Sequence, residues 1–93
     1  MIVRLEGMKL ENHAAGKDYA AYQRLVLYTS RVPDAGDNGD IIGRVTHEYG
    51  FKLDTQARID LATLFRVVEP GTDINLEIRV NGRYETICGF SEV

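Results

Sequence analysis

The amino-acid sequence predicts a mainly β protein with one short helix, on the strength of three observations. Apolar and polar residues alternate from Ile74 to Val80, as in a half-buried strand, and the following Asn81-Gly82 favours a hairpin turn. Aromatic and β-branched residues are concentrated between Tyr22 and Thr29, as they are in strands. Only Thr63 to Val68 is expected to form a helix, because Glu69-Pro70-Gly71 ends it.

The first 40 residues are predicted to form strands around two breaks. Ile2 to Glu6 has the mixed alternation of a strand, and a soft break runs from Glu11 to Lys17. Asp18 to Ser30 suits either a helix capped by Asp18 or a strand, and its aromatic and branched residues favour the strand. Pro, Gly, Asn and Asp dominate Val32 to Asp40, so we expect an exposed loop that divides the chain.

The second half is predicted to begin with an extended segment from Ile41 to Leu53. Gly43 and Gly50 should weaken or bend it. Asp54 to Ala57 is then expected to be a turn, and Arg58 to Leu61 alternates polar with apolar residues like a short strand.

The register of the closing hairpin depends on the length of its loop. A two-residue turn would pair Val80 with Arg83, which places apolar and charged side chains on one face. A three-residue loop pairs Val80 with Tyr84 and Leu76 with Cys88, and it keeps one face apolar. We therefore predict the longer loop, with Cys88 in the core.

Length and charge narrow the class of protein. The 93 residues allow one compact domain, and a domain this small has a marginal core, so a homodimer is expected. No run approaches the roughly 18–20 apolar residues that span a bilayer. The N-terminus carries charges that a secretion signal lacks, and the single cysteine fits a reducing compartment, so we expect a cytoplasmic protein without membrane association. The net charge of −3 does not favour nucleic acid, but residues 1–31 carry +2 and residues 32–41 carry −3.

The sequence contains no pattern that predicts catalysis. His13 and His47 have no second His or Cys at ligand spacing, and no nucleophile elbow, carboxylate pair or phosphate loop is found. We therefore expect neither an enzyme nor a bound metal or cofactor.

The second half of the chain resembles the swapped-hairpin DNA-binding module of the AbrB, MazE and MraZ regulators. The run Leu53 to Arg66 is similar to that family's Leu-Asp-x-x-Gly-Arg turn, strand, short helix and Arg. Val68 to Ile74 and Glu77 to Gly82 stand where its Pro-Gly turn and closing hairpin belong. Ala57 replaces the usual Gly, and Ala62 replaces the usual Pro.

This resemblance covers about residues 42–90 and implies an AbrB-like barrel made by two interleaved copies. It divides the chain into residues 1–40, a β extension of unknown role, and residues 41–93, the module. It implies a DNA-binding transcriptional regulator or antitoxin-like homodimer that contacts duplex DNA. By position, Arg58 matches the family's turn Arg and Arg66 the Arg that ends its short helix. Lys52 lies in the preceding strand, and Arg44 lies on the same run.

Two other functions compete with this expectation. The acidic balance favours a protein-interaction or assembly module on the same fold without DNA binding, and on that interpretation Arg58 forms a salt bridge to Asp54. The third is a small β-barrel that binds single-stranded nucleic acid. Tyrosines and basic residues are interleaved in that part of the chain, namely Lys17, Tyr19, Tyr22, Arg24 and Tyr28. Core tyrosines with solvated hydroxyl groups would give the same pattern.

Overall fold

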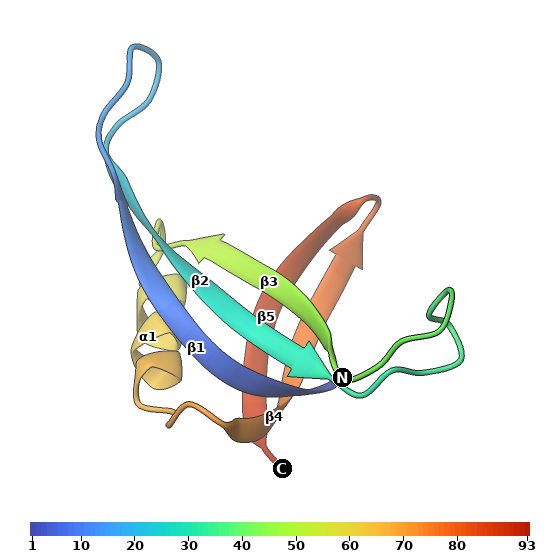
Figure 1. Cartoon of the computed structure of the whole chain (residues 1–93). Coiled ribbons are helices and arrows are strands. Elements are labelled where there is room, and N and C mark those ends of the chain that lie inside the picture. Colours follow the sequence, from blue (N-terminus) through green and yellow to red (C-terminus); the bar gives the residue numbers. More distant parts are fainter.

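The computed structural model describes all 93 residues as five strands and one helix. The elements are β1 (Ile2–His13), β2 (Tyr22–Arg31), β3 (Val45–Lys52), α1 (Gln56–Arg66), β4 (Thr72–Asn81) and β5 (Tyr84–Glu92). All strand pairs are antiparallel, and they form one sheet in the order β3-β2-β1-β4-β5 (Figure 1). The prediction of a mainly β fold with one short helix is confirmed.

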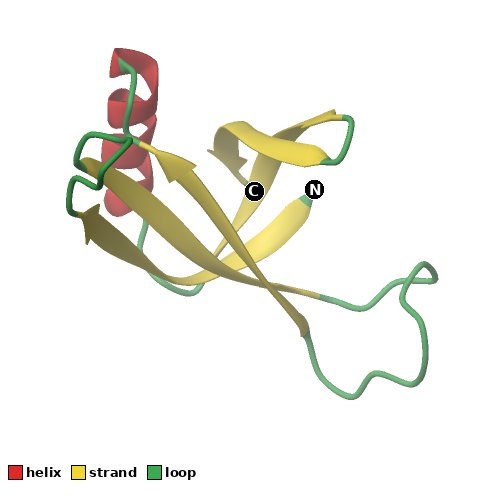
Figure 2. Cartoon of the chain, turned by 90° about the horizontal axis from the view of Figure 1, so that it is seen from above, coloured by secondary structure: helices red, strands yellow, loops and turns green.

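The sheet curls strongly, so that its two edge strands approach each other. Strands β3 and β5 are in contact, yet no hydrogen-bonded ladder joins them, and the sheet is not closed. Figures 1 and 2 show the β4–β5 hairpin turning toward β3, with α1 standing at one side of the curled sheet. The gap between β3 and β5 is called the seam below.

The core lies inside this curl and is centred on Phe65 of α1. The Phe65 side chain is fully buried, and its ring lies 6.1 Å from that of Phe51 and 4.2 Å from that of Phe90. Strands contribute alternate residues to the same core, which is why the period-2 pattern was visible in the sequence. The core cluster is Val3, Leu5, Leu25, Leu27, Phe51, Ala62, Phe65, Val68, Ile74, Leu76 and Ile87.

The helix begins earlier than predicted and replaces the expected strand at Arg58 to Leu61. Thr55, predicted to lie in a turn, is the N-cap, and its side-chain oxygen accepts a hydrogen bond from the Arg58 backbone N–H at 3.2 Å. From this cap, α1 buries Ala62 and Phe65 on one face. Four alternating residues could not outweigh a capped helix with that apolar stripe. The predicted helix at Thr63 to Val68 overlaps only the last turn of α1.

The hairpin register is also different from the prediction. Asn81 pairs with Tyr84, so the turn has two residues, and Gly82 takes a φ of 63° that suits glycine. The register shifts at a bulge beside Glu77 and Ile78, so apolar residues still face each other farther along the ladder. The bulge therefore preserves the apolar face that a longer loop was expected to preserve.

Cys88 is exposed rather than buried, as a result of this bulge. Ile78 pairs with Ile87 and Leu76 with Phe90, which leaves Cys88 outside both apolar pairs. The prediction of a core cysteine is wrong because it depended on the three-residue loop.

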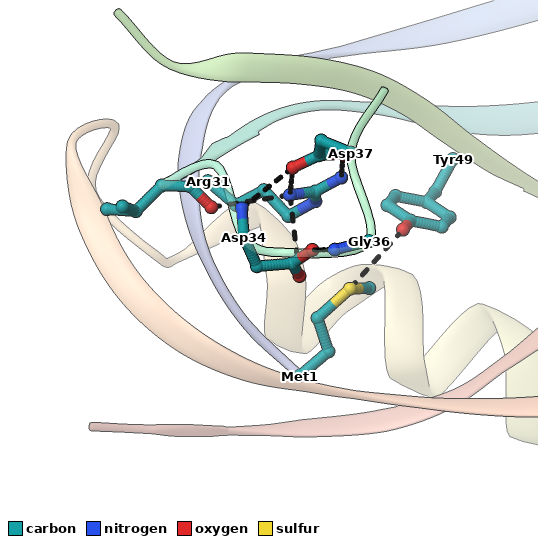
Figure 3. A network of polar contacts seen from close by, with 7 residues as sticks. Met1, Arg31, Asp34, Gly36, Asp37 and Tyr49 are labelled. Carbon is teal, nitrogen blue, oxygen red and sulfur yellow. Dashed lines mark hydrogen bonds and ion pairs between the residues drawn. The ribbon is translucent and has the colours of Figure 1, made fainter. Parts of the chain in front are cut away.

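The first half confirms the predicted loop and both strands, but β1 continues to His13, so the break predicted from Glu11 to Lys17 begins only after that residue. Residues Asp18 to Ser30, for which the sequence left both a helix and a strand open, form a strand from Tyr22 onward. Val32 to Asp40 forms no helix or strand. In this loop Arg31 donates two hydrogen bonds to Asp37 at 2.8 and 2.7 Å, and these lower the pKa of Asp37 to about 2. Figure 3 shows this network beside the Tyr49 hydroxyl, which lies 3.8 Å from the Met1 sulfur. The single helix is too short and too polar to cross a membrane.

Candidate nucleic-acid interface

The first three strands present one surface that points away from the core, called the outer face here. Side chains alternate across a strand, so the burial of Leu25 and Leu27 places their neighbours on the other side. Strand pairing then aligns Glu11, Arg24 and Lys52 in one row across β1, β2 and β3. The outer face comprises Lys9, Glu11, His13, Tyr22, Arg24, Val26, Tyr28, Glu48, Gly50 and Lys52.

Aromatic rings gather at the end of this face where β1 leads into β2. The Tyr22 ring stacks on His13 with centroids 4.6 Å apart and planes 7° from parallel. Tyr19, from the connecting loop, meets it edge-on at 6.3 Å and is 58% exposed. The Lys52 ammonium lies 4.3 Å from the Tyr22 ring centroid, close enough for a cation–π contact. The cluster therefore combines flat rings with a positive charge.

Glu11 connects the basic side chains in the middle of the outer face. Its carboxylate lies 3.0 Å from Lys9 Nζ, 3.1 Å from His13 Nε2 and 3.5 Å from Arg24 Nη1. Hydrogen bonds from His13 and Lys9 favour its charged form and lower its pKa to about 2. One carboxylate thus holds Lys9, Arg24 and His13 in a fixed arrangement and partly neutralises the charges of Lys9 and Arg24.

Arg24 lies across β3 at a position where the neighbouring strand has no side chain. A Cβ atom built at Gly50 would overlap the Arg24 guanidinium, so glycine leaves room for the guanidinium in this position and a larger residue would displace it. Val26 beneath these side chains is 3% exposed, although it belongs to the outer face and not to the core cluster. The outer face therefore has an apolar floor covered by long basic side chains, which is how such side chains usually pack.

The four residues implied by the family resemblance do not share one surface. Lys52 and Arg58 border the same depression at the seam. Arg44 lies just before β3, at its other end, where Nε donates to Ser30 Oγ at 2.8 Å and Nη2 to the Ser30 carbonyl at 3.0 Å. Arg66 is the last residue of α1, about 12 Å along the helix axis from Arg58.

The salt bridge that sequence reasoning offered for Arg58 is present. Arg58 Nη1 lies 2.8 Å from Asp54 Oδ1, and the Arg58 side chain is 37% exposed. This pair stabilises the first turn of α1 and leaves part of the guanidinium facing outward.

Sequence reasoning missed Lys9, Glu11 and His13 as a group. Their i, i+2, i+4 spacing in β1 was a usable signal, because it places all three side chains on one side of a strand. It gave no hint of their partners, since these depend on the pairing of β1 with β2.

Neither the protein-family models, nor the curated proteins, nor the solved structures contain a match to this chain. No cluster of three or more His, Cys, Asp or Glu side chains that could hold a metal ion is found.

Proposed function

We propose that this chain binds single-stranded nucleic acid on the outer face of β1, β2 and β3. Its element order, with three strands, one helix and two strands, corresponds to the OB fold, as do its strand neighbours. That fold is a five-stranded, partly open barrel that binds oligonucleotides with its β2–β3 face and the β1–β2 and β4–β5 loops. The aromatic cluster and the basic row occupy the corresponding face here.

The observation that carries the proposal is the combination of Tyr22, His13, Tyr19 and Lys52 at the edge of this face. Proteins that bind single strands stack bases on aromatic rings and follow the backbone with basic side chains. Tyr19 is exposed enough to accept a base, and Tyr22 already supports a parallel ring. A base that stacks on Tyr22 would have to displace the His13 ring, which occupies that position.

The net charge of −3 is distributed unevenly, and the segment with the highest density of acidic residues lies away from the proposed site. Asp34, Asp37 and Asp40 all belong to the loop that follows Arg31. Tyr22 and Arg31 stand at opposite ends of β2, about 30 Å apart for an extended strand. Salt therefore screens the aromatic cluster from this loop, and the local field is set by Lys9, Arg24 and Lys52 together with the Glu11 carboxylate that pairs with two of them.

The test is fluorescence anisotropy with labelled oligothymidine, at two salt concentrations. Tyr22→Ala should weaken binding about 5- to 150-fold, which corresponds to the loss of one stacked base. Lys52→Ala should weaken it and flatten the salt dependence. Arg66→Ala is the matched control, because it removes an exposed charge outside the face and should leave affinity unchanged. Equal affinity of wild type and Tyr22→Ala would exclude the outer face as the binding site.

Duplex DNA is the second candidate ligand, favoured by the meeting of Lys52 and Arg58 at one depression. A swapped-hairpin dimer would use Arg58 and Arg66 together and would prefer duplex to single strands. Tight duplex binding that is lost in both Arg58→Ala and Arg66→Ala would support that regulator. A folded protein that binds neither ligand at low salt would favour a protein-interaction module instead.

A further inference from the structure

The seam between β3 and β5 contains a basic depression. It has a volume of about 220 Å³ and is lined by Arg24, Gly50, Phe51, Lys52, Arg58, Glu85, Thr86 and Ile87. Three cationic side chains from β2, β3 and α1 therefore meet at the place where the barrel is not closed. Glu85 is the single carboxylate among the lining residues.

Two of these cations retain hydrogen-bond donors that no protein group uses. Arg58 makes one side-chain hydrogen bond, from Nη1 to Asp54, so Nε and Nη2 have no protein acceptor. Arg24 makes one ion pair, from Nη1 to Glu11 at 3.5 Å, and no side-chain hydrogen bond. The Lys52 ammonium faces only the Tyr22 ring. Guanidinium groups with free donors are suited to phosphate, which they bind through paired hydrogen bonds.

Arg24 reaches the seam by crossing over Gly50. The guanidinium of Arg24 lies over Gly50, in space that a Cβ atom would occupy. Glycine costs stability inside a strand, since it has no side chain to pack and loses more backbone freedom on folding. Glycine at this point of β3 leaves the space that the Arg24 guanidinium occupies.

We propose that the seam depression binds a phosphate group between Arg24, Lys52 and Arg58. Where the phosphate belongs to a nucleic acid, the inference rests on the proposed function, because an oligonucleotide stacked on Tyr22 would pass Lys52 on its way to the seam. The phosphate can come from the backbone of that strand or from a phosphorylated end. Both present the same oxygen acceptors, and a terminal phosphate carries more charge.

The first experiment uses inorganic phosphate and follows the arginine Nε–H signals by NMR. In the wild type, phosphate should shift the Arg24 and Arg58 signals, and chloride at equal ionic strength should not. Arg58→Gln should weaken phosphate binding at least about tenfold, the loss expected for a charge-assisted hydrogen bond. Arg66→Gln, a charge removal on the same helix, should leave it unchanged. Absence of the shifts in the wild type, or equal shifts in Arg58→Gln, overturns the proposal.

Gly50→Ala provides a second variant that changes no charge. The new methyl group should displace the Arg24 guanidinium and weaken phosphate binding, with the circular dichroism spectrum unchanged. Phosphate shifts that persist unaltered at Arg24 in this variant would contradict the role assigned to Gly50 and Arg24.

Oligothymidines with a 5′-phosphate, a 3′-phosphate or neither distinguish the two sources. If Arg58→Gln weakens all three equally and reduces the salt slope by about 0.7, the seam binds a backbone phosphate. If Arg58→Gln removes only the extra affinity that a phosphate at one end confers, the seam binds that end. Phosphate binding without any oligonucleotide binding would sustain the seam site and refute the proposed function. Oligonucleotide binding that Arg58→Gln leaves unchanged would support the proposed function and refute the seam site.

Discussion

Replacing Glu11 by glutamine should strengthen binding of single strands, because it frees basic groups that the carboxylate now holds. Lys9 and Arg24 both lie within 3.5 Å of Glu11 and face the proposed ligand. If each gains a phosphate contact, the slope of log affinity against log salt steepens by about 1.4. Between about 50 and 200 mM salt, that added slope means about sevenfold more loss of affinity than the wild type shows.

The same substitution should lower stability at neutral pH. The pKa of Glu11 is depressed from 4.5 to about 2, so its charged form stabilises the folded state above pH 4.5. That contribution disappears as pH falls toward 2, where the carboxylate becomes protonated. Urea denaturation of both proteins should therefore show a stability difference at pH 7 that closes between pH 4.5 and 2.

Anisotropy titrations of wild type and Glu11→Gln over a series of salt concentrations measure the slope directly. Glu48→Gln is a suitable control, since it removes a carboxylate from the same face that has no ion pair. Weaker binding by Glu11→Gln, with an unchanged slope, would refute the reasoning. Glu11 would then act by positioning Lys9 and Arg24 for the ligand rather than by competing with it.

Four further predictions concern the fold. Ala62→Pro should cost about 3 kcal/mol or more in urea denaturation, because position 62 lies inside α1, whereas a short helix opening there would accept proline. Cys88 should react with a thiol reagent in the native protein as fast as in urea. A slower reaction in the native protein would mean that Cys88 is buried, as the three-residue hairpin loop predicted. Asp37→Asn should destabilise at pH 7 but not near pH 2, since Arg31 lowers the pKa of Asp37 from 3.8 to about 2; a difference that persists at pH 2 would contradict this pairing. Phe65→Ala should cost about 3–5 kcal/mol by calorimetry or denaturation, and a cost below about 1 kcal/mol would remove Phe65 from the centre of the core.

The strands could be predicted from the sequence because their periodicity is local. Ile74 to Val80 alternates for as long as one side faces the core, and the β4 strand follows it. The start of the helix was missed at Thr55, because Asp, Thr and Gln are read equally well as a turn or as a capped first turn. The bulge in the hairpin had no local signal. It follows from the requirement that Leu76 and Ile78 face apolar partners across a two-residue turn.

The candidate site was predictable only in part, for a related reason. Tyr22, Arg24 and Lys17 drew attention because aromatic and basic residues alternate there within one short segment. Glu11 and Gly50 acquire their roles from strand pairing, which brings together residues from three strands. The contact between Arg24 and Gly50 could not be predicted from the sequence of β2 or of β3 alone.

The central position of β1 has a consequence for how the chain folds. Its residues Arg4 to His13 pair with β2, which follows after one short loop, whereas Val3 pairs with Ile74, about 70 residues later. During synthesis, a β1–β2–β3 meander can therefore form while the side of β1 reserved for β4 is still unpaired. That exposed edge is a template for association with other nascent chains until β4 arrives. Refolding should accordingly be slow and sensitive to protein concentration.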